Sequence, residues 1–351
     1  MAEALLVNEP TTTNTADDGR RTHAWPSLKG AKRYTLIFTI LLGLAVAITV
    51  GTLAWDNPLP VGTTGFWRIA NLRATNLVIV LVVAICQSLA TVAFHTVTNN
   101  RIITPSIMGF ESLYRVIQTG AVFLFGVAGI TMVQGIGQFI GQVAVMVLFS
   151  ALLYGWLLSG RFGNMHIMLL VGIVIGGGLG ALSTFMQRLL TPTEFDVLTA
   201  RLIGSVANAD ATYLGFSIPL AVAAGGLLWL GYQRLNVLAL GREVAVNLGV
   251  NHRRQTIIVL LLVSVLMAVS TSLVGPMTFF GFLVAMLAYQ LADTHDHRFV
   301  FPIACLTGFV VLGGSYFVLK HIFYAAGSVG IIIEIVGGTA FLVHIIRKGR
   351  L

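Results

Sequence analysis

The chain has 351 residues, of which 56% are hydrophobic and only 10% charged, with a mean hydropathy of +0.89. A soluble domain carries about 25% charged residues, so the composition excludes one and predicts an integral membrane protein. The 21 Lys and Arg residues outnumber the 13 Asp and Glu residues. In a membrane protein this excess first indicates orientation, not nucleic acid binding.

The chain begins with a polar stretch rich in Thr, Asp and Arg that lacks the apolar core and cleavage site of a signal peptide. We interpret residues 1–33 as a disordered tail and residues 34–351 as one all-α transmembrane domain. A helix needs about 20 apolar residues to cross a bilayer core of about 30 Å. About ten such spans follow: Tyr34–Ala54, Asn76–Val97, Pro105–Phe125, Gly137–Leu158, Met165–Gln187, Ala211–Tyr232, Gln255–Leu273, Met277–Ala292, Phe299–Leu319 and Val329–Ile346.

Two long charge-free stretches must each be divided into two spans. No charge lies between Arg115 and Arg161, a length that as one helix would be about twice the thickness of the bilayer core. Glycines suit the reversal there: Gly126, Gly129, Gly135 and Gly137. The second stretch, Arg254 to Asp293, is expected to break near Gly275-Pro276.

The basic residues predict how the chain is oriented. Fifteen Lys and Arg residues fall on one side of the ten-span arrangement and five on the other, with Arg115 inside a span. Because cytoplasmic loops are the ones enriched in Lys and Arg, both termini and residues 236–254 are predicted to be cytoplasmic. The two cysteines, Cys86 and Cys305, lie in apolar runs and indicate no disulfide framework.

Spans 3 and 8 begin alike. Pro105 is followed by Gly109-Phe110, and Pro276 by Gly281-Phe282. The two spans hold equivalent places in spans 2–5 and 7–10 but enter from opposite faces, which indicates an inverted repeat of the kind found in transporters. The alternative is coincidence, because Pro at helix starts and Gly in membrane helices are both common.

Residues 236–254 form a patterned polar segment between spans 6 and 7. Its apolar residues recur every four positions and so share one stripe of a short helix: Leu240, Val244 and Leu248. Gly249 can end this helix, and Asn251 can cap the next one. The pattern predicts a helix–turn–helix at the membrane surface, which either shows this stripe to a partner or rests on lipid headgroups.

Charged residues inside spans are costly and often functional. Glu111 and Arg115 lie one helical turn apart in span 3 and suit an ion pair, while Glu334 lies about a turn into span 10. They either line a polar path or form structural contacts between helices. Span 5 is glycine-rich and, with the segment Ser183 to Ala207, is a candidate gate. The residues assigned to the path or gate are Glu111, Arg115, Glu334, Gly176, Gly177, Ser183 and Gln187.

Enzyme signatures are missing from the sequence. None of the four lysines follows a glycine, so the phosphate-binding Gly-x4-Gly-Lys-[Ser/Thr] motif is lacking, and there is no His-Glu-x-x-His. If transport uses ATP, another chain must hydrolyse it. The sequence Asp293-Thr-His-Asp-His297 contains metal-ligating residue types, but we interpret it as a short solvated turn and expect no metal site.

Several motifs resemble those of permeases in the iron-siderophore and vitamin B12 family of ABC importers. The most specific are the coupling loop, here Leu240–Arg254 (LGREVAVNLGVNHRR), and Asp296-His297-Arg298 followed by Pro302. Other matches are Thr104-Pro105 with Gly109, Gly275-Pro276 with Gly281-Phe282, and Val329-Gly330 with Gly337. The resemblance covers roughly Arg73 to Arg347. The sequence departs from the family pattern at Ala285-Met286, Asn76 and Gly338, which resembles a siderophore sub-branch often encoded beside a second permease.

The resemblance implies a ten-helix permease that imports a ferric siderophore together with a second permease subunit, in a homodimer or a heterodimer. Two cytoplasmic ATPases would bind the ATP and dock on the coupling loop, and an extracytoplasmic binding protein would deliver the chelate. This chain would bind no cofactor itself. The implied ATPase contacts are Leu240, Gly241, Arg242, Glu243, Val244, Ala245, Leu248 and Gly249. Arg73 and Lys320 are implied contacts of the binding protein, or else interfacial anchors.

The sequence is also compatible with two alternative functions. A permease of the same family could carry a corrinoid or haem. An ion-coupled secondary transporter could use Glu111, Arg115 and Glu334 as a relay, although this would leave the patterned segment at residues 236–254 unexplained.

Overall fold

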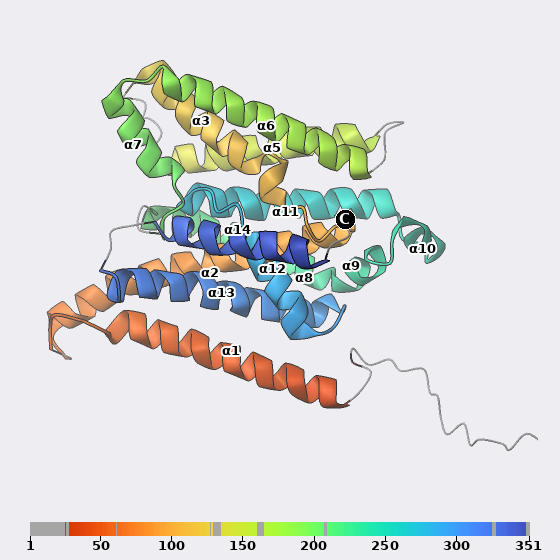
Figure 1. Cartoon of the computed structure of the whole chain (residues 1–351), viewed down its shortest axis with the longest axis horizontal. Coiled ribbons are helices and arrows are strands. Elements are labelled where there is room, and N and C mark those ends of the chain that lie inside the picture. Colours follow the sequence, from red (N-terminus) through yellow and green to blue (C-terminus); the bar gives the residue numbers. More distant parts are fainter. Residues whose placement is uncertain are drawn as a thin grey trace, which may run out of the picture.

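The computed structural model describes residues 25, 28–60, 62–126, 128, 135–159, 165–206, 209–324 and 328–348. Within these residues the chain is helical and contains no strand. Most of the helices run along the long axis of the molecule, with the short helices α7 and α10 at opposite ends (Figure 1). The elements are α1 (Leu28–Ala54), α2 (Thr64–Thr98), η1 (Pro105–Met108), α3 (Phe110–Phe125), α5 (Ile136–Ser159), α6 (Met165–Arg188), α7 (Pro192–Leu202), η3 (Ala211–Tyr213), α8 (Leu214–Leu230), α9 (Tyr232–Leu238), α10 (Arg242–Asn247), α11 (His252–Val274), α12 (Phe280–Ala292), α13 (His297–His321) and α14 (Val329–Lys348).

Each predicted span overlaps at least one helix of the described residues. Seven helices in the described residues are long and apolar enough to cross a membrane, as expected of a multi-pass membrane protein: α1, α2, α5, α6, the helix beginning at Ala211, α11 and α13. The remaining spans correspond to α3 with 16 residues, α12 with 13 and α14 with 20. The two expected divisions are confirmed, because Gly126, Gly135 and Gly275 all adopt positive φ angles where the chain turns.

The boundaries of two helices differ from the prediction. α1 begins at Leu28, before the expected start at Tyr34, and residues 1–24 of the predicted tail lie outside the described residues. α2 begins at Thr64, well before Asn76, and its 35 residues span about 52 Å at 1.5 Å per residue. A helix of that length exceeds the bilayer core, so hydropathy alone could not locate its polar first turns.

Spans 3 and 8 are not continuous helices. Span 3 begins with the 3-10 turn η1, followed by Gly109 at a φ of 100°, and α3 starts only at Phe110. In span 8 the chain turns after Gly275 and α12 starts at Phe280. The proline at each entry removes a backbone donor, and the structure places ordinary α-helix only beyond these irregular entries.

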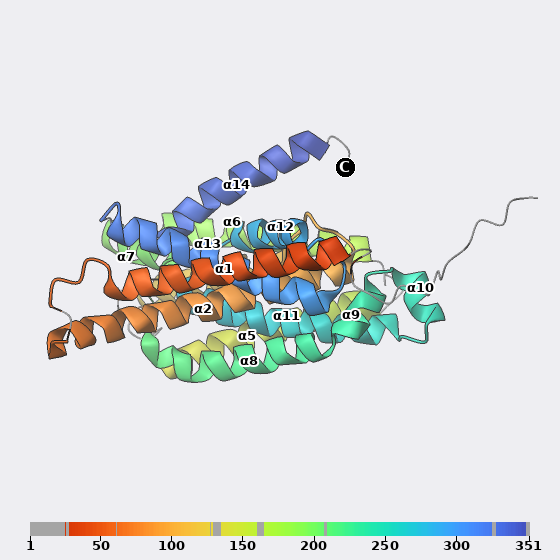
Figure 2. The same cartoon turned by 90° about the horizontal axis from the view of Figure 1, so that it is seen from below.

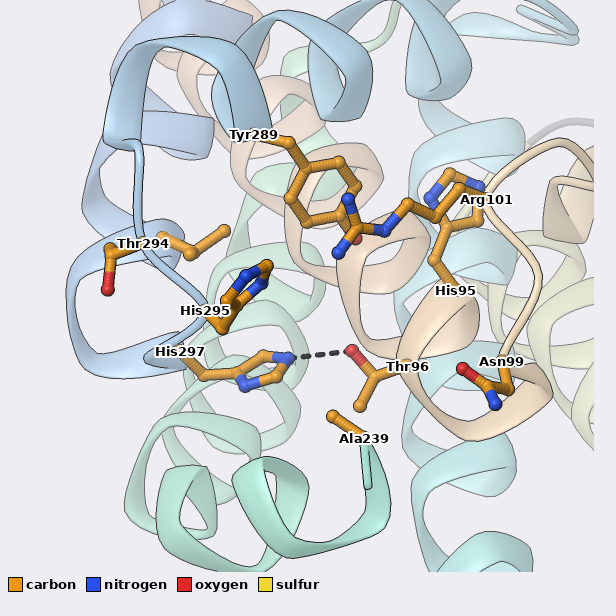
Figure 3. A pocket seen from close by; sticks show the side chains of 10 residues that line it. His95, Thr96, Asn99, Arg101, Ala239, Tyr289, Thr294, His295 and His297 are labelled. Atoms are coloured by element: carbon orange, nitrogen blue, oxygen red, sulfur yellow. Dashed lines mark hydrogen bonds between the residues drawn. The ribbon is translucent and has the colours of Figure 1, made fainter. Parts of the chain in front are cut away.

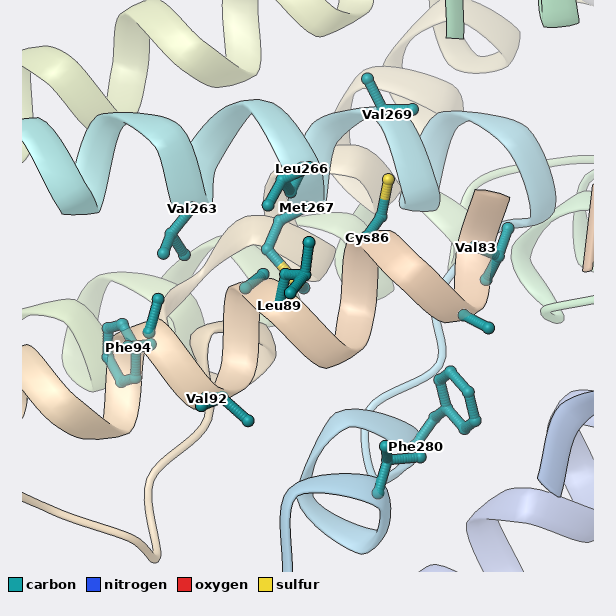
Figure 4. Packing of buried hydrophobic residues seen from close by; sticks show 14 of the residues in the cluster. Val83, Cys86, Leu89, Val92, Phe94, Val263, Leu266, Met267, Val269 and Phe280 are labelled. Atoms are coloured by element: carbon teal, nitrogen blue, oxygen red, sulfur yellow. The ribbon is translucent and has the colours of Figure 1, made fainter. Parts of the chain in front are cut away.

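The core is centred on the contact between α2 and α11. Val83, Cys86 and Leu89 of α2 face Leu266 and Met267 of α11, and all five are buried (Figure 4). Neighbouring helices approach α2 closely at small residues: a Cβ added to Gly308 of α13 would meet the Ser88 side chain. Such small contacts let helices pack tightly in a membrane, where apolar side chains gain little by leaving lipid.

Candidate functional site

The segment at residues 236–254, which we call the coupling segment, forms an elbow at one end of the molecule. α9 and α10 are separated by a turn, and α10 protrudes beyond the long helices (Figure 2). Gly241 and Gly249 border α10 with φ angles of 91° and 79°, which suit glycine. Asn251 caps α11 by accepting a hydrogen bond from the Arg254 backbone N–H at 3.1 Å. The predicted helix–turn–helix is therefore confirmed in form.

α10 is anchored on one side and open on the other. Ala245 is fully buried, as are Leu235 and Leu238 of α9. The apolar stripe is exposed: Leu240 by 59%, Val244 by 44% and Leu248 by 59%. Arg242, Glu243 and Asn247 are exposed as well. The elbow is thus fixed to the bundle through small and buried side chains and presents its apolar stripe outward.

A hydrogen-bonded joint ties the coupling segment to the long helices. Asn236 of α9 accepts hydrogen bonds at its Oδ1 from the His297 backbone N–H (3.0 Å), and the same Oδ1 lies 2.6 Å from His297 Nδ1. On the other side of the ring, His297 Nε2 lies 2.6 Å from Thr96 Oγ1 of α2 (Figure 3). Asp296 accepts from the Asn236 side-chain amide and from the Arg298 backbone N–H, capping α13. The Asp296-His297-Arg298 motif is therefore a joint between three helices.

A cavity of about 240 Å³ lies beside this joint. Its buried floor contains His95, Thr96 and His297, whereas Asn99, Arg101, Ala239 and His295 are exposed at its rim. The Arg101 guanidinium lies 4.5 Å from the centre of the Tyr289 ring (Figure 3). No cluster of metal-ligating side chains is found in the described residues.

Glu111 contacts the entry to α12 instead of Arg115. Its carboxylate accepts a hydrogen bond from the Met277 backbone N–H at 3.1 Å and one from the Thr278 hydroxyl at 2.5 Å. No ion pair joins Glu111 to Arg115 within the described part of the chain, where Arg33–Asp293 is the ion pair observed. The expected i,i+4 pair is thus wrong, because a buried carboxylate near unpaired backbone donors binds them first. Glu111 therefore connects the start of α3 in span 3 to the segment before α12 in span 8 through hydrogen bonds.

The predicted gate residues of α6 fall into two groups. Gly176 is buried against the Gly109 backbone, and a Cβ there would come within 3.0 Å of Gly109 and of the Ile107 carbonyl. Ser183 is buried and lies 2.9 Å from the Thr119 hydroxyl, and the Gln187 amide donates to Ser183 at 2.9 Å. Gly177, in contrast, is exposed with open space beside it. One face of α6 therefore packs on η1 and α3, and the other is uncovered in the subunit.

The candidate gate segment continues after α6 with the short helix α7, whose N-terminal cap the sequence analysis missed. Thr191-Pro192 separates α6 from α7, and Thr191 and Glu194 form a capping box. Hydrogen bonds from the Thr191 backbone N–H and hydroxyl lower the pKa of Glu194. The Thr-x-x-Glu spacing of this capping box is visible in the sequence and could have revealed the cap.

Two glycines, Gly204 and Gly330, allow close backbone contacts at the end of α7. The Gly330 backbone N–H donates to the Gly204 carbonyl at 3.1 Å, and the Ser205 N–H donates to the Val274 carbonyl at 2.8 Å. A Cβ at Gly204 would collide with the Pro276 carbonyl, and one at Gly330 with the Gly204 carbonyl. α7, the α11–α12 turn and the start of α14 are therefore held together by direct backbone contact, for which glycine is required.

A polar cavity of about 480 Å³ opens at the α7 end of the molecule. Three glutamines of its wall are hydrogen-bonded together: Gln118 and Gln138 both donate to Gln142, at 2.8 and 2.7 Å, and Gln142 donates to Ser272. Arg201 of α7 and Asp210 also line it. This cavity could accept polar groups of a ligand, and the sequence analysis predicted only the part of its wall that belongs to the candidate gate segment, such as Val197 and Arg201.

The two outer cations have different surroundings. Arg73 donates hydrogen bonds to the carbonyls of Thr52, Trp55 and Asp56, at 3.2, 2.7 and 3.0 Å. These are carbonyls at the C-terminus of α1, where a cation is favoured. Lys320 is exposed and donates to the Tyr316 hydroxyl at 3.1 Å. Arg73 is therefore committed to holding α1, a role that the sequence could not reveal because it depends on tertiary packing.

Glu334 lies on α14, which leans away from the other helices (Figure 2). Its side chain is half-buried, whereas the neighbouring Ile331, Ile335 and Val336 are exposed. α14 is anchored instead at Gly337, where a Cβ would collide with Phe279. Gly177 is thus exposed and Glu334 half-buried in this subunit, whereas Glu111 is buried.

Comparisons with known proteins agree with these features. The model of the FecCD transport family matches residues 34–347. The chain is 47% identical over 335 residues to the petrobactin import system permease protein FatC of Bacillus anthracis, covering 95% of each chain. It is 34% identical to the petrobactin import system permease protein YclO of Bacillus subtilis, covering 91% of this chain and 99% of YclO. By contrast, it is only 23% identical to FatD, another petrobactin import permease of Bacillus anthracis, covering 79% of this chain and 81% of FatD.

A solved structure shares the fold. A metal-chelate type ABC transporter in an inward-facing conformation matches with a TM-score of 0.73 at 22% identity, covering 89% of this chain and 99% of the other.

Proposed function

The chain belongs to the FecCD transport family, and on that premise we propose that it is the membrane-spanning permease subunit of an ABC importer for ferric siderophores. The coupling segment is the observation that carries this proposal, because its apolar stripe is exposed at one end of the molecule while its base is hydrogen-bonded to α2 and α13. A separate ATPase would bind the coupling segment, and its conformational changes during ATP hydrolysis would drive transport.

The proposed substrate is a ferric petrobactin-type chelate. This rests on the two relatives named as petrobactin import permeases, at 47% and 34% identity. A strain lacking this chain should lose uptake of radiolabelled ferric petrobactin and regain it on complementation. Unchanged uptake of petrobactin, with loss of another ferric chelate, a corrinoid or haem, would reassign the substrate within the family.

We also propose the assembly and its orientation. The chain would cross the bacterial cytoplasmic membrane ten times, with both termini and α10 in the cytoplasm, as the distribution of Lys and Arg favours. α1 starts and α14 ends toward the end of the molecule where α10 lies, which supports this orientation (Figure 1). Two ATPases would dock at that end, and a binding protein would dock at the α7 end, near Lys320.

The translocation path would lie between this chain and a second permease. The uncovered face of α6 at Gly177 and the open face of α14 at Glu334 would line or border it. The polar cavity at the α7 end, with its three glutamines, would receive polar groups of the entering chelate. An inverted repeat relating spans 2–5 to spans 7–10 would account for the irregular entries of spans 3 and 8, which Glu111 joins.

The test is to break the proposed ATPase contact without disturbing the fold. Leu248→Asp places a charge in the exposed stripe, and it should abolish co-purification of the ATPase and uptake of the chelate. Val246→Asp is the matched control, because Val246 is 54% exposed on the same helix but off the stripe. Normal ATPase recovery with Leu248→Asp would contradict the proposal.

An ion-coupled secondary transporter is the competing function, and the geometry disfavours it. Its relay residue Glu111 is occupied by two hydrogen bonds to the α12 entry, and no hydrogen bond links it to Glu334 in the described part of the chain. Uptake that persists when the ATPase gene is deleted would favour this alternative.

A further inference from the structure

The cavity beside the joint is cationic and contains no acidic group. The ionisable side chains that line it are three histidines, Arg101 and Tyr289. The nearest carboxylates of the α12–α13 turn are engaged elsewhere: Asp293 pairs with Arg33 at 3.0 Å, and Asp296 binds Asn236 and caps α13. In the described residues no carboxylate lies within ion-pairing distance of Arg101.

The polar groups of the cavity differ in whether they already have hydrogen-bond partners. His297 and Thr96 bind each other, and His297 also binds Asn236. Both ring nitrogens of the buried His95 lack a partner in hydrogen-bond geometry, although the Ile103 backbone lies nearby. The Arg101 guanidinium lies over the Tyr289 ring, and no hydrogen bond from its N–H donors is observed among the described residues. Carboxylate and phosphate groups both suit such a planar donor, and a docked protein supplies a carboxylate on Asp or Glu.

The rim also shows where the carboxylate would come from. Ala239 forms part of the rim and immediately precedes Leu240, the first residue of the exposed stripe. Any protein seated on Leu240, Val244 and Leu248 would therefore cover the mouth of the cavity. A volume of about 240 Å³ can hold one acidic side chain but not a folded segment.

We propose that this cavity receives an Asp or Glu side chain of the ATPase that docks on the coupling segment, with Arg101 as its ion-pair partner. The proposal rests on the proposed function, because it assumes that an ATPase docks there. The pair would fix the ATPase beside the Asn236–His297–Thr96 joint. Arg101 follows the end of α2 at Thr98. The pair would therefore give the ATPase a second mechanical connection to the long helices, besides its contact with α10.

Charge reversal tests the proposal on the solubilised complex. Arg101→Glu should weaken binding of the ATPase at least about tenfold, and Arg101→Gln should flatten the salt dependence of binding. Arg234→Glu is the matched control, because Arg234 is exposed on α9 but does not line the cavity. Equal losses for Arg101→Glu and Arg234→Glu would indicate general repulsion and overturn the proposal. The thermal unfolding midpoint of each variant verifies that the permease is folded.

The acidic partner is then sought by reversing each Asp and Glu on the membrane-facing surface of the ATPase to Arg. One such reversal should restore binding to Arg101→Glu and not to Arg234→Glu. If none does, the anion is not an ATPase side chain and the proposal is wrong. Stabilisation of the permease by inorganic phosphate that persists with the ATPase bound would likewise overturn it, assigning the cavity to a free anion. If no ATPase binds the wild-type permease, the proposed function fails instead.

Discussion

At the scale of single residues, Arg73 illustrates how a charge near the membrane surface can serve the fold before it serves a partner. Its guanidinium binds three carbonyls at the end of α1. We expect Arg73→Gln to lower the free energy of unfolding by about 1–2 kcal/mol, since these are partly exposed hydrogen bonds from a charged donor. Thermal unfolding of the purified permease measures this. Lys320→Gln is the control and should leave stability unchanged; if Arg73→Gln does so too while weakening binding-protein association, Arg73 is a docking residue.

Glu111 allows a proton relay to be separated from a structural role. In Glu111→Gln the carbonyl can still accept from Met277 N–H and the amide can donate to the Thr278 hydroxyl, so uptake should fall by no more than about twofold. Glu111→Ala leaves the Met277 donor buried without a partner and should reduce both folded yield and uptake. Uptake in whole cells, normalised to protein amount, gives both values. Abolished uptake in a well-folded Glu111→Gln would instead require the carboxylate for transport.

At the scale of elements, α6 and α7 form the segment that we expect to move. Ser183 is only 1% exposed, whereas Val197 is 37% exposed and lines the polar cavity at the α7 end. In a background lacking Cys86 and Cys305, Val197→Cys should react with a membrane-impermeant thiol reagent in the conformation described here, and Ser183→Cys should not. ATP-trapped complexes should change one or both rates, because a gate must rearrange during turnover. Equal labelling in both states with intact uptake would make the segment part of the static packing.

The sequence predicted elements best where the rule depends only on neighbouring residues. Apolar runs located every long helix, and Gly249 and Asn251 marked the elbow because a helix end needs a positive φ and a cap. The start of α2 at Thr64 was not predictable, because these polar turns lie beyond the apolar run. The partners of Glu111 and Arg73 were missed for a different reason. Glu111 binds groups 166 and 167 residues away, and Arg73 binds carbonyls of the preceding helix 17 to 21 residues away. Such contacts depend on how helices pack, which no local pattern encodes.

Candidate site residues were likewise predictable from the sequence only where their role depends on a local pattern. The exposed stripe followed from the four-residue period, whereas the role of Asp296-His297 did not, because His297 binds α9 and α2 across the fold. The motif resembled a metal cluster on residue types alone. Its hydrogen bonds show a joint whose histidine is already satisfied on both nitrogens.

At the scale of the whole molecule, two exposed surfaces of the subunit support the proposal that a second permease packs against it. α14 leans away from the bundle and carries Glu334 among exposed isoleucines and valine (Figure 2). A half-buried carboxylate facing lipid would be costly, so we expect the proposed second permease to cover α14 or to enclose Glu334 in a polar path. The uncovered glycine face of α6 suits close approach by another helix.

The second permease is either another copy of this chain or a different protein. A homodimer interface must be self-complementary, with the same patch used twice around a two-fold axis. The relatives favour two different permeases instead, because FatC and FatD of Bacillus anthracis are both petrobactin import permeases and this chain resembles them very unequally. We therefore expect two differently tagged copies of this chain, expressed with the neighbouring transport genes, not to co-purify, while a second permease co-purifies with each. Recovery of both tags in one complex at stoichiometric yield would instead establish a homodimer, and would place two Glu334 side chains around one central path.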